Sequence, residues 1–334
     1  MVIKMEIPQE VVKIAEDIKT MRIRGAGRIA RAAAKALKIA AQMYEGPNDP
    51  IEFRRYMARV ADLLISTRPT AVSLPNAVYY VMYHLEKAEG SVEELREAVI
   101  RAADTFIAES LEAVKKIGRI GAKRIKDDAV VLTHCHSTAA VSVIVEAYKM
   151  GKIRRVYSTE TRPFFQGRIT FRHLTREGVP VTQIPDSAVR YIMHEVDQVV
   201  VGADTVTSNG AVVNKIGTSQ VALAAHEARV RVFVAAETYK FSPATVIGEL
   251  VPIEFRDPTE IVPAEWIAKH PNVRVLNPSF DVTPPEYIDA IITELGVIPP
   301  QSAILILLER FGWALEKIKQ GGIGRIRFEE TLEE

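Results

Sequence analysis

The sequence has almost no cysteine: Cys135 is the only one among 334 residues. A single cysteine excludes a disulfide within the chain and a metal site built from several thiolates. Most free cysteines are small buried apolar residues, so a functional thiol needs support from its surroundings. The position of Cys135 in the fold therefore decides how it is interpreted.

The sequence also lacks an excess of charge of one sign, and it lacks long apolar runs. The 43 basic and 42 acidic residues leave a net charge of +1, which argues against a nucleic-acid partner bound through a broad basic surface. No stretch reaches about 18 apolar residues without a charge, so the sequence predicts no membrane span. The first 20 residues contain no uninterrupted apolar segment of the signal-peptide kind, and we expect a cytoplasmic protein.

The first part of the chain has the periodicity of helices. A length of 334 residues suits about two domains. Ser91 followed by Glu94 forms a capping box at the start of a long helix. Helices are predicted over 11–18, 27–43, 51–66, 76–88 and 92–125. We therefore predict an N-terminal helical domain over residues 1–126.

After Asp128 short β-branched runs alternate with helical segments. The runs cover 129–134, 154–160, 179–184, 197–204 and 231–237, and most are followed by a segment with helical periodicity. Such alternation predicts parallel strands joined by right-handed helical connections. The expected fold class is α/β, with a doubly wound, Rossmann-like parallel sheet over 127–334. A tight turn is predicted at 208–210, late strands and loops from 249, and a final helix over 304–319.

Cys135 directly follows the first predicted strand and precedes a helix. Ligands of open parallel sheets bind at the carboxyl ends of the strands, so this position favours function over simple burial. A helix N-terminus is expected to lower the pKa of the thiol and to favour the thiolate. Protonated side chains of His134 and His136 would add to this effect. Two neighbouring histidines do not make a metal site, and we expect neither a metal nor a cofactor.

Asp204 ends another predicted strand, and its carboxylate should lie at the same edge of the sheet. A lone aspartate after a strand is usually a turn former or a helix cap. Here it is followed by Asn214, Lys215 and Gly217, of which the lysine suits phosphate and the glycine begins a helix. The combination of these residues is a more specific signal of a ligand site than any one of them alone.

Further candidates surround these two. The segment Arg24-Gly25-Ala26-Gly27-Arg28 precedes the Ala-rich helix, where glycines let a backbone approach an anion and arginines donate in pairs. A turn between helices is its simple alternative, and Arg68 is either a helix stop or a second guanidinium. Arg162 and Gln166 follow the second strand, and Lys240 follows the fifth. We expect all of these at one edge of the sheet.

Six segments together resemble a known superfamily: 24–30, 68–77, 132–139, 160–168, 202–218 and 235–241. It comprises methylthioribose-1-phosphate isomerases, archaeal ribose-1,5-bisphosphate isomerases, and the regulatory alpha, beta and delta subunits of the eukaryotic translation-initiation exchange factor. Its enzymes carry the Cys and Asp found here. The run Cys135-His136-Ser137-Thr138 is similar to the bisphosphate isomerases, whereas the methylthioribose enzymes typically have an Asn-Thr-Gly type run. The resemblance implies conversion of α-D-ribose 1,5-bisphosphate to D-ribulose 1,5-bisphosphate, in archaeal nucleoside monophosphate salvage.

The chemistry of this substrate assigns roles to the candidates. Its anomeric oxygen carries a phosphate, so isomerisation must remove a proton from C2, protonate the ring oxygen and return a proton to C1. We expect Cys135 to be the base toward carbon and Asp204 the acid and base toward oxygen. One phosphate is assigned to Arg24, Gly25, Ala26, Gly27, Arg28 and Arg68, the other to Ser137, Thr138, Arg162 and Gln166. Asn214, Lys215 and Lys240 are expected to orient hydroxyls or the C1 phosphate.

Two alternatives stay open. An isomerase of methylthioribose 1-phosphate needs an apolar slot in place of the second phosphate site. A non-catalytic regulatory subunit would bind a translation partner, which the presence of Cys135 and Asp204 disfavours. No G-x-G-x-x-G follows the first strand, which disfavours a dehydrogenase. The resemblance further implies a homo-oligomer, a hexamer built from dimers, and makes a nucleotide activator plausible.

Overall fold

The structure, a computed structural model, describes residues 6–68 and 70–321, with side chains through Gly312. Over these residues the chain forms two compact units: the helical unit, which runs to Glu112 and resumes at Phe311, and the sheet unit, Ala113–Arg310. The predicted domain boundary, between residues 126 and 127, lies between the end of the last N-terminal helix and the first strand, and it stays a prediction. None of the helices in these ranges is long and apolar enough to cross a membrane.

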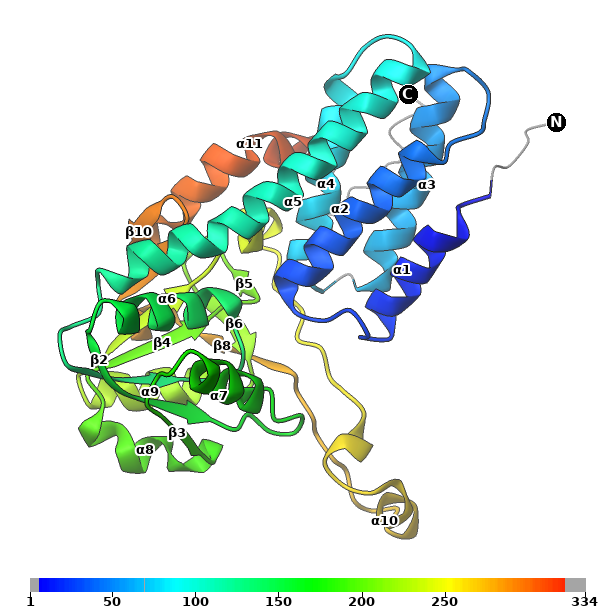
Figure 1. Cartoon of the computed structure of the whole chain (residues 1–334). Helices are drawn as coiled ribbons and strands as arrows, with labels where there is room; N and C mark the ends of the chain where they lie inside the picture. Colours follow the sequence, from blue (N-terminus) through cyan, green and yellow to red (C-terminus); the bar gives the residue numbers. More distant parts are fainter. Residues whose placement is uncertain (1–5, 69, 322–334) are drawn as a thin grey trace. The chain divides into compact units, whose positions relative to one another are not determined.

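The helical unit confirms the helices predicted for the first part of the chain. They are α1 (Gln9–Lys19), α2 (Ala26–Gln42), α3 (Pro50–Thr67), α4 (Ser73–Lys87) and the first part of α5 (Val92–Ala122). The buried face of α2 is mostly alanine, and this small face packs against α1, α3 and α4 (Figure 1). The predicted capping box starts α5, because the Glu94 carboxylate accepts from the Ser91 amide at 2.7 Å.

The sheet unit confirms the doubly wound parallel sheet. Its seven strands are ordered β10-β9-β7-β4-β1-β2-β3, and every neighbouring pair is parallel except β9 with β10. The strands are β1 (Ala129–Thr133), β2 (Ile153–Thr159), β3 (Val181–Ile184), β4 (Gln198–Gly202), β7 (Arg231–Ala235), β9 (Ala290–Thr293) and β10 (Gly296–Ile298). The strand order reverses between β1 and β4, which is the point where such sheets bind ligands.

Helices cover both faces of this sheet (Figure 1). One face packs against the last part of α5, α6 (Thr138–Lys149) and α7 (Gly167–Arg176) in a single apolar core. The other carries α8 (Val189–Ile192) and α9 (Thr218–Glu227). The segment with helical periodicity that follows the third run, 187–195, contains only one α-helical turn, α8, between the 3-10 turns η1 (Asp186–Ala188) and η2 (Met193–Glu195).

A second, three-stranded sheet lies beside the first and was not predicted as a unit. Its order is β5-β6-β8, and it consists of β5 (Thr205–Val206), β6 (Val212–Lys215) and β8 (Phe280–Thr283). The predicted turn at 208–210 joins β5 to β6 in an antiparallel hairpin. The partner β8 comes from far along the chain, and local sequence patterns do not reveal such pairing.

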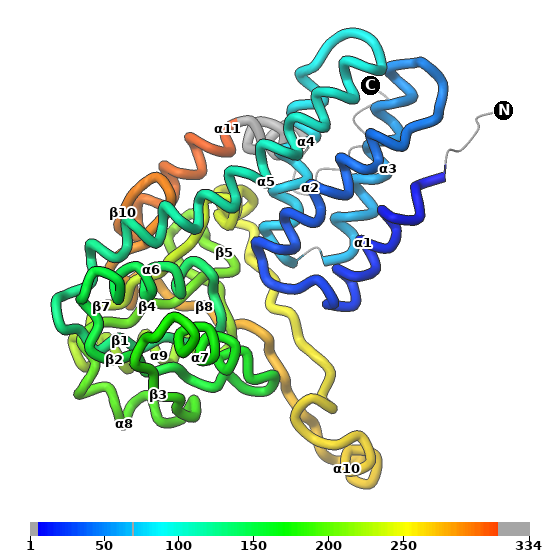
Figure 2. Tube along the Cα trace, viewed as in Figure 1, coloured from blue at the N-terminus to red at the C-terminus, as the bar shows by residue number. Residues whose placement is uncertain are grey.

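Between β7 and β8 the chain makes a long excursion, residues 248–276, which we call the arm (Figure 2). It carries the 3-10 turn η5 (Pro258–Glu260) and the short helix α10 (Ala264–Lys269), and returns to the sheet unit at β8. The remaining 3-10 turns are η3 (Thr238–Lys240), η4 (Pro243–Ile247), η6 (Pro285–Tyr287) and η7 (Pro300–Ser302). The predicted final helix is α11 (Ala303–Gly321).

Candidate active site

Cys135 lies in the turn between β1 and α6, at the carboxyl edge of the parallel sheet. Its backbone is left-handed, with φ of 65°, which costs free energy in a non-glycine residue and is frequent at functional sites. The Cys135 amide donates to Oγ1 of Thr161 at 3.0 Å, and its carbonyl accepts from the Thr170 hydroxyl at 2.8 Å. The turn is therefore held from β2 and from α7.

The expected lowering of the thiol pKa is wrong in this structure. The residue as a whole is half-buried, but protein surrounds the thiol, and this burial raises the pKa of Cys135 to about 12. The Lys215 cation opposes the effect, while Asp204 and Asp186 add to it. The cap of α6 is Ser137, two residues later, so Cys135 is not at the helix N-terminus.

The two flanking histidines are neutral rather than cationic. Burial lowers the pKa of His136 to about 4, and burial also lowers the pKa of His134. Nδ1 of His136 donates to the Thr170 hydroxyl at 2.9 Å, because that hydroxyl already donates to the Cys135 carbonyl. The expectation that protonated imidazoles favour the thiolate is therefore wrong.

Asp204 follows β4 and precedes β5, so the strand rule places it at the same edge as Cys135. Its amide donates to the Val213 carbonyl at 3.0 Å, which ties the residue to the small sheet. Its carboxylate is close enough to Cys135 to raise the pKa of the thiol. The two residues predicted to share the chemistry thus lie in one electrostatic environment.

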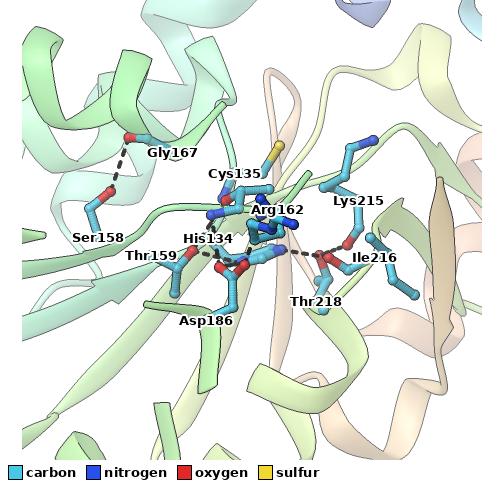
Figure 3. A network of polar contacts seen from close by, with 12 residues as sticks. His134, Cys135, Ser158, Thr159, Arg162, Gly167, Asp186, Lys215, Ile216 and Thr218 are labelled. Carbon is cyan, nitrogen blue, oxygen red and sulfur yellow. Dashed lines mark hydrogen bonds and ion pairs between the residues drawn. The ribbon is translucent and has the colours of Figure 1, made fainter. Parts of the chain in front are cut away.

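Lys215 ends β6 and is the cation that acts on the thiol. Its ammonium lies 4.9 Å from the centroid of the Phe280 ring, and Figure 3 shows it on the side of the polar network where the Cys135 sulfur lies. Neighbouring Asn214 is buried, and its amide donates to the Thr218 hydroxyl at 3.0 Å. Lys215 thus acts on the thiol from the small sheet, whereas the Asn214 side chain bonds to the start of α9 and its part in the site stays a prediction.

The start of α9 is occupied by a carboxylate of the chain itself. Asp281 on β8 accepts from the amides of Gly217 at 2.7 Å and Ser219 at 3.1 Å. Burial raises its pKa to about 6. Gly217 does directly precede the helix, as expected, but the amides at this helix start serve Asp281, which sequence reasoning missed.

Lys240 follows β7 and is paired. Its ammonium lies 2.7 Å from Oε2 of Glu237, and only 7% and 1% of the two side chains are exposed. The Tyr239 hydroxyl donates to the other Glu237 oxygen at 3.0 Å. Next in the chain, Phe241 bridges to Val206, two residues from Asp204, so Lys240 belongs to the same edge of the sheet unit.

The four residues predicted to hold the second phosphate lie at the start of α6 or in the loop before α7. Ser137 caps α6 by accepting from the Ala140 amide, and Thr138 is the first helical residue. A Cβ on Gly202 would lie 2.3 Å from that of Ser137, so glycine is required there. Arg162 is exposed beside the Phe165 ring, and Oε1 of Gln166 is buried without a hydrogen-bond donor among the described residues.

The remaining predicted residues belong to the helical unit. Gly25, with φ of 90°, directly precedes α2, and Ala26, Gly27 and Arg28 form its first turn. Arg24 lies just before them, and Arg68 ends α3. Their proposed part in substrate binding stays a prediction.

Comparison with known proteins places the chain in a family. The model of the "Initiation factor 2 subunit family" matches residues 22–300. The chain belongs to this family. The matched range includes every candidate residue named above.

Relatives of this chain carry three different functional names. Proteins named "Ribose 1,5-bisphosphate isomerase" from Pyrococcus furiosus and Thermococcus kodakarensis are 55% and 53% identical, over 93% of this chain in both cases and 97% and 98% of theirs. A "Methylthioribose-1-phosphate isomerase" from Desulforamulus reducens is 39% identical over 87% of each chain. Among solved structures, translation initiation factor eIF-2B from Pyrococcus horikoshii OT3 is 31% identical, with a TM-score of 0.76, over 89% of this chain and 99% of that one.

Within this family fold, several site residues escaped sequence reasoning. Thr159 ends β2, while Thr161 and Asp186 come two residues after β2 and β3, so the strand-end rule contained the signal that would have found them. Glu237 likewise ends the run predicted as the fifth strand. Asp281 had no local signal, because it arrives through the pairing of β8 with β6. Nowhere in residues 6–68 and 70–321 do three His, Cys, Asp or Glu side chains gather as metal ligands would.

Proposed function

We propose that the protein is an isomerase that converts α-D-ribose 1,5-bisphosphate to D-ribulose 1,5-bisphosphate. One observation carries the proposal: Cys135 and Asp204, the thiol and carboxylate that the reaction needs, share one electrostatic environment at the carboxyl edge of the sheet. The relatives at 53–55% identity that bear this activity in their names support it.

The choice of the bisphosphate over methylthioribose 1-phosphate rests on similarity and on polarity. The methylthioribose relative is less similar, at 39% identity. The start of α6 and the loop before α7 offer hydroxyls, a guanidinium and an amide at Ser137, Thr138, Arg162 and Gln166. This lining suits a second phosphate better than an apolar methylthio group.

The proposed reaction transfers protons at carbon and at oxygen and breaks one bond of the sugar ring. Cys135 removes the proton from C2 while Asp204 protonates the ring oxygen, and the bond from C1 to that oxygen breaks. The product of this step is an enol with a C1–C2 double bond. Asp204 then takes the proton from the C2 hydroxyl, and the Cys135 thiol returns its proton to C1, which leaves a ketone at C2 and restores both residues.

The raised thiol pKa changes how Cys135 would act as a base. Thiolate is scarce near pH 7, but a conjugate acid with a pKa of about 12 makes it a strong base once formed. The Lys215 cation favours the charged form. A weakly acidic C–H bond is the kind of target for which such a base is useful.

Neighbouring groups suit the uncharged oxygens of the sugar. The pair of Lys240 with Glu237 presents N–H donors without net charge, which suits a hydroxyl. The buried amide oxygen of Gln166 can accept from a hydroxyl in the same way. The Arg24 to Arg28 segment and Arg68 are proposed for the phosphate that the sheet unit does not hold.

Finer features extend the proposal beyond the reaction. We propose a cytoplasmic homo-oligomer, a hexamer built from dimers, that acts in archaeal nucleoside monophosphate salvage and responds to a nucleotide activator. The superfamily resemblance supports each of these points. Mass measurement in solution and turnover with and without added nucleoside monophosphates test them separately.

The decisive experiment compares substrates on the purified chain. Turnover of ribose 1,5-bisphosphate, with the ketose product identified by NMR, is expected to exceed that of methylthioribose 1-phosphate by at least about 100-fold. Faster turnover of the methylthioribose substrate would replace the proposal with its closest alternative. No turnover of either, with stable binding to a translation initiation factor, would favour a regulatory subunit.

A further inference from the structure

His134 joins three strand ends next to Cys135. It follows β1 directly and is 2% exposed. Its Nδ1 lies 2.7 Å from Oγ1 of Thr159 at the end of β2, and its Nε2 lies 2.9 Å from the Ile216 carbonyl after β6. Figure 3 shows these contacts on the side of the network away from the Cys135 sulfur.

The direction of every hydrogen bond in this group follows from one contact. The Ile216 carbonyl can only accept, so Nε2 of His134 carries the proton and donates. In the neutral ring Nδ1 then accepts from the Thr159 hydroxyl. That hydroxyl has no second proton for Thr161, 3.2 Å away, so Thr161 donates to Thr159. Oγ1 of Thr161 in turn accepts from the Cys135 amide.

The chain of hydrogen bonds joins the segment that carries the thiol to the segment that follows Lys215. At one end is the left-handed backbone of Cys135, and at the other is the loop that begins at Ile216, directly after Lys215. Gly217 in this loop has φ of 101°, and a Cβ there would lie 3.0 Å from Cε1 of His134. The ring therefore fills the space that glycine leaves and fixes the distance between the two segments.

We propose that His134, as the neutral Nε2–H tautomer, is a positioning residue that holds the Cys135 thiol and Lys215 in register for proton transfer. The part that concerns proton transfer rests on the proposed isomerase function. The tautomer and the link are properties of the chain itself. The charged groups that face the ring are Asp186, with Oδ1 4.0 Å from Nδ1, and Lys215.

The tautomer can be observed directly. In the full-length protein labelled with ¹⁵N-histidine at pH 7, His134 is expected to show a protonated Nε2 and an unprotonated Nδ1. Its signals are identified by their loss in His134→Gln. A protonated Nδ1, alone or together with a protonated Nε2, would overturn the proposal without any variant having to fold.

The link is tested by removing one hydroxyl. Thr159→Val breaks the bond to His134, whereas Thr159→Ser keeps it. Thr283→Val is the matched control, because the Thr283 hydroxyl is buried without a hydrogen-bond partner in the described part of the chain. For Thr159→Val, kcat is expected to fall about 10- to 100-fold, with KM within about threefold. Thr159→Ser and Thr283→Val should stay within about threefold in both.

Alkylation of the single cysteine gives a readout that needs no substrate. When the turn loosens, water reaches the thiol and its pKa falls toward the ordinary value, so iodoacetamide should react about tenfold faster at pH 8 in Thr159→Val. A purely structural role would lower the melting temperature and leave this rate and kcat unchanged, which would refute the proposal. If alkylation changes as expected but the wild type turns over no sugar phosphate, the isomerase assignment fails and the link stands.

Discussion

Two regions of the sheet unit, the edge that carries Cys135 and the arm, differ from the usual pattern in which polar side chains are exposed and apolar side chains are buried. The edge that carries Cys135 buries polar groups: His134, Thr159 and Thr161 are each at most 2% exposed. In the arm, residues 248–276, all of which the structure describes, no side chain is buried. Its large apolar residues are exposed instead, Leu250 at 92% and Leu276 at 74%.

The difference follows from what holds each region. At the edge, left-handed backbone at Cys135 and Thr161 is kept in place by buried hydrogen bonds from three strands. The arm is tied mainly at its base, where Arg256 pairs with Glu260 at 2.6 Å and Asn277 donates to Glu260 at 3.0 Å. Small changes at the edge should therefore be costly, and larger changes in the arm should not.

The largest expected effect is on the thiol itself. Cys135→Ser replaces the base by a hydroxyl that does not ionise in the working range, and kcat for ribose 1,5-bisphosphate should fall about 10³-fold. The melting temperature should stay within a few degrees, since the change is nearly isosteric. Near-normal turnover by this variant would remove Cys135 from the mechanism.

The next largest effect is expected when a methyl group is added at this edge of the sheet. Gly167→Ala would place a Cβ 1.7 Å from the Thr159 carbonyl oxygen, and urea unfolding is expected to show a loss of about 3 kcal/mol. The matched variant in the arm is Gly248→Ala, which has φ of 89° and open space around the new Cβ. Its cost should be only about 1 kcal/mol, from the backbone alone. Equal losses would abolish the contrast between the two regions.

The pH dependence of alkylation tests the burial of the thiol. Because burial raises the pKa of Cys135 to about 12, the thiolate fraction grows tenfold per pH unit throughout the neutral range. The rate constant for alkylation of wild-type Cys135 by iodoacetamide should therefore rise about 100-fold between pH 7 and pH 9. A rise that levels off by pH 9 would mean that the thiol has an ordinary or lowered pKa.

A smaller effect should appear in stability as a function of pH. Burial raises the folded-state pKa of Asp281 from 3.8 to about 6, so the folded chain binds this proton more tightly than the unfolded chain. This contribution is present at low pH and is lost as the pH rises from about 4 to about 6. Relative to Asp281→Asn, the wild type should lose about 1–2 kcal/mol over that window, after allowance for partial exposure. A constant difference between the two proteins would contradict the shift.

These sites also show where sequence reasoning succeeds. Local patterns found the capping box at Ser91, the turn at 208–210 and five strands of the large sheet, because each depends on neighbours in the chain. These strands are β1, β2, β3, β4 and β7. The same patterns placed Cys135 and Asp204 at one edge through the strand-end rule. The thiol pKa was wrong because burial depends on the whole fold, whereas the nearby helix was visible in the sequence. Asp281 was missed because β8 pairs with β6 across a long separation.

The smallest effects are expected in the arm. Leu250→Ser and Leu276→Ser remove large apolar side chains that already contact water, so each should change the free energy of unfolding by no more than about 0.5 kcal/mol. Urea unfolding at two protein concentrations measures this. Losses above about 1.5 kcal/mol that grow at the higher concentration would contradict the prediction. They would mean that another surface covers the arm in solution, since a side chain this exposed has little of its own chain to lose.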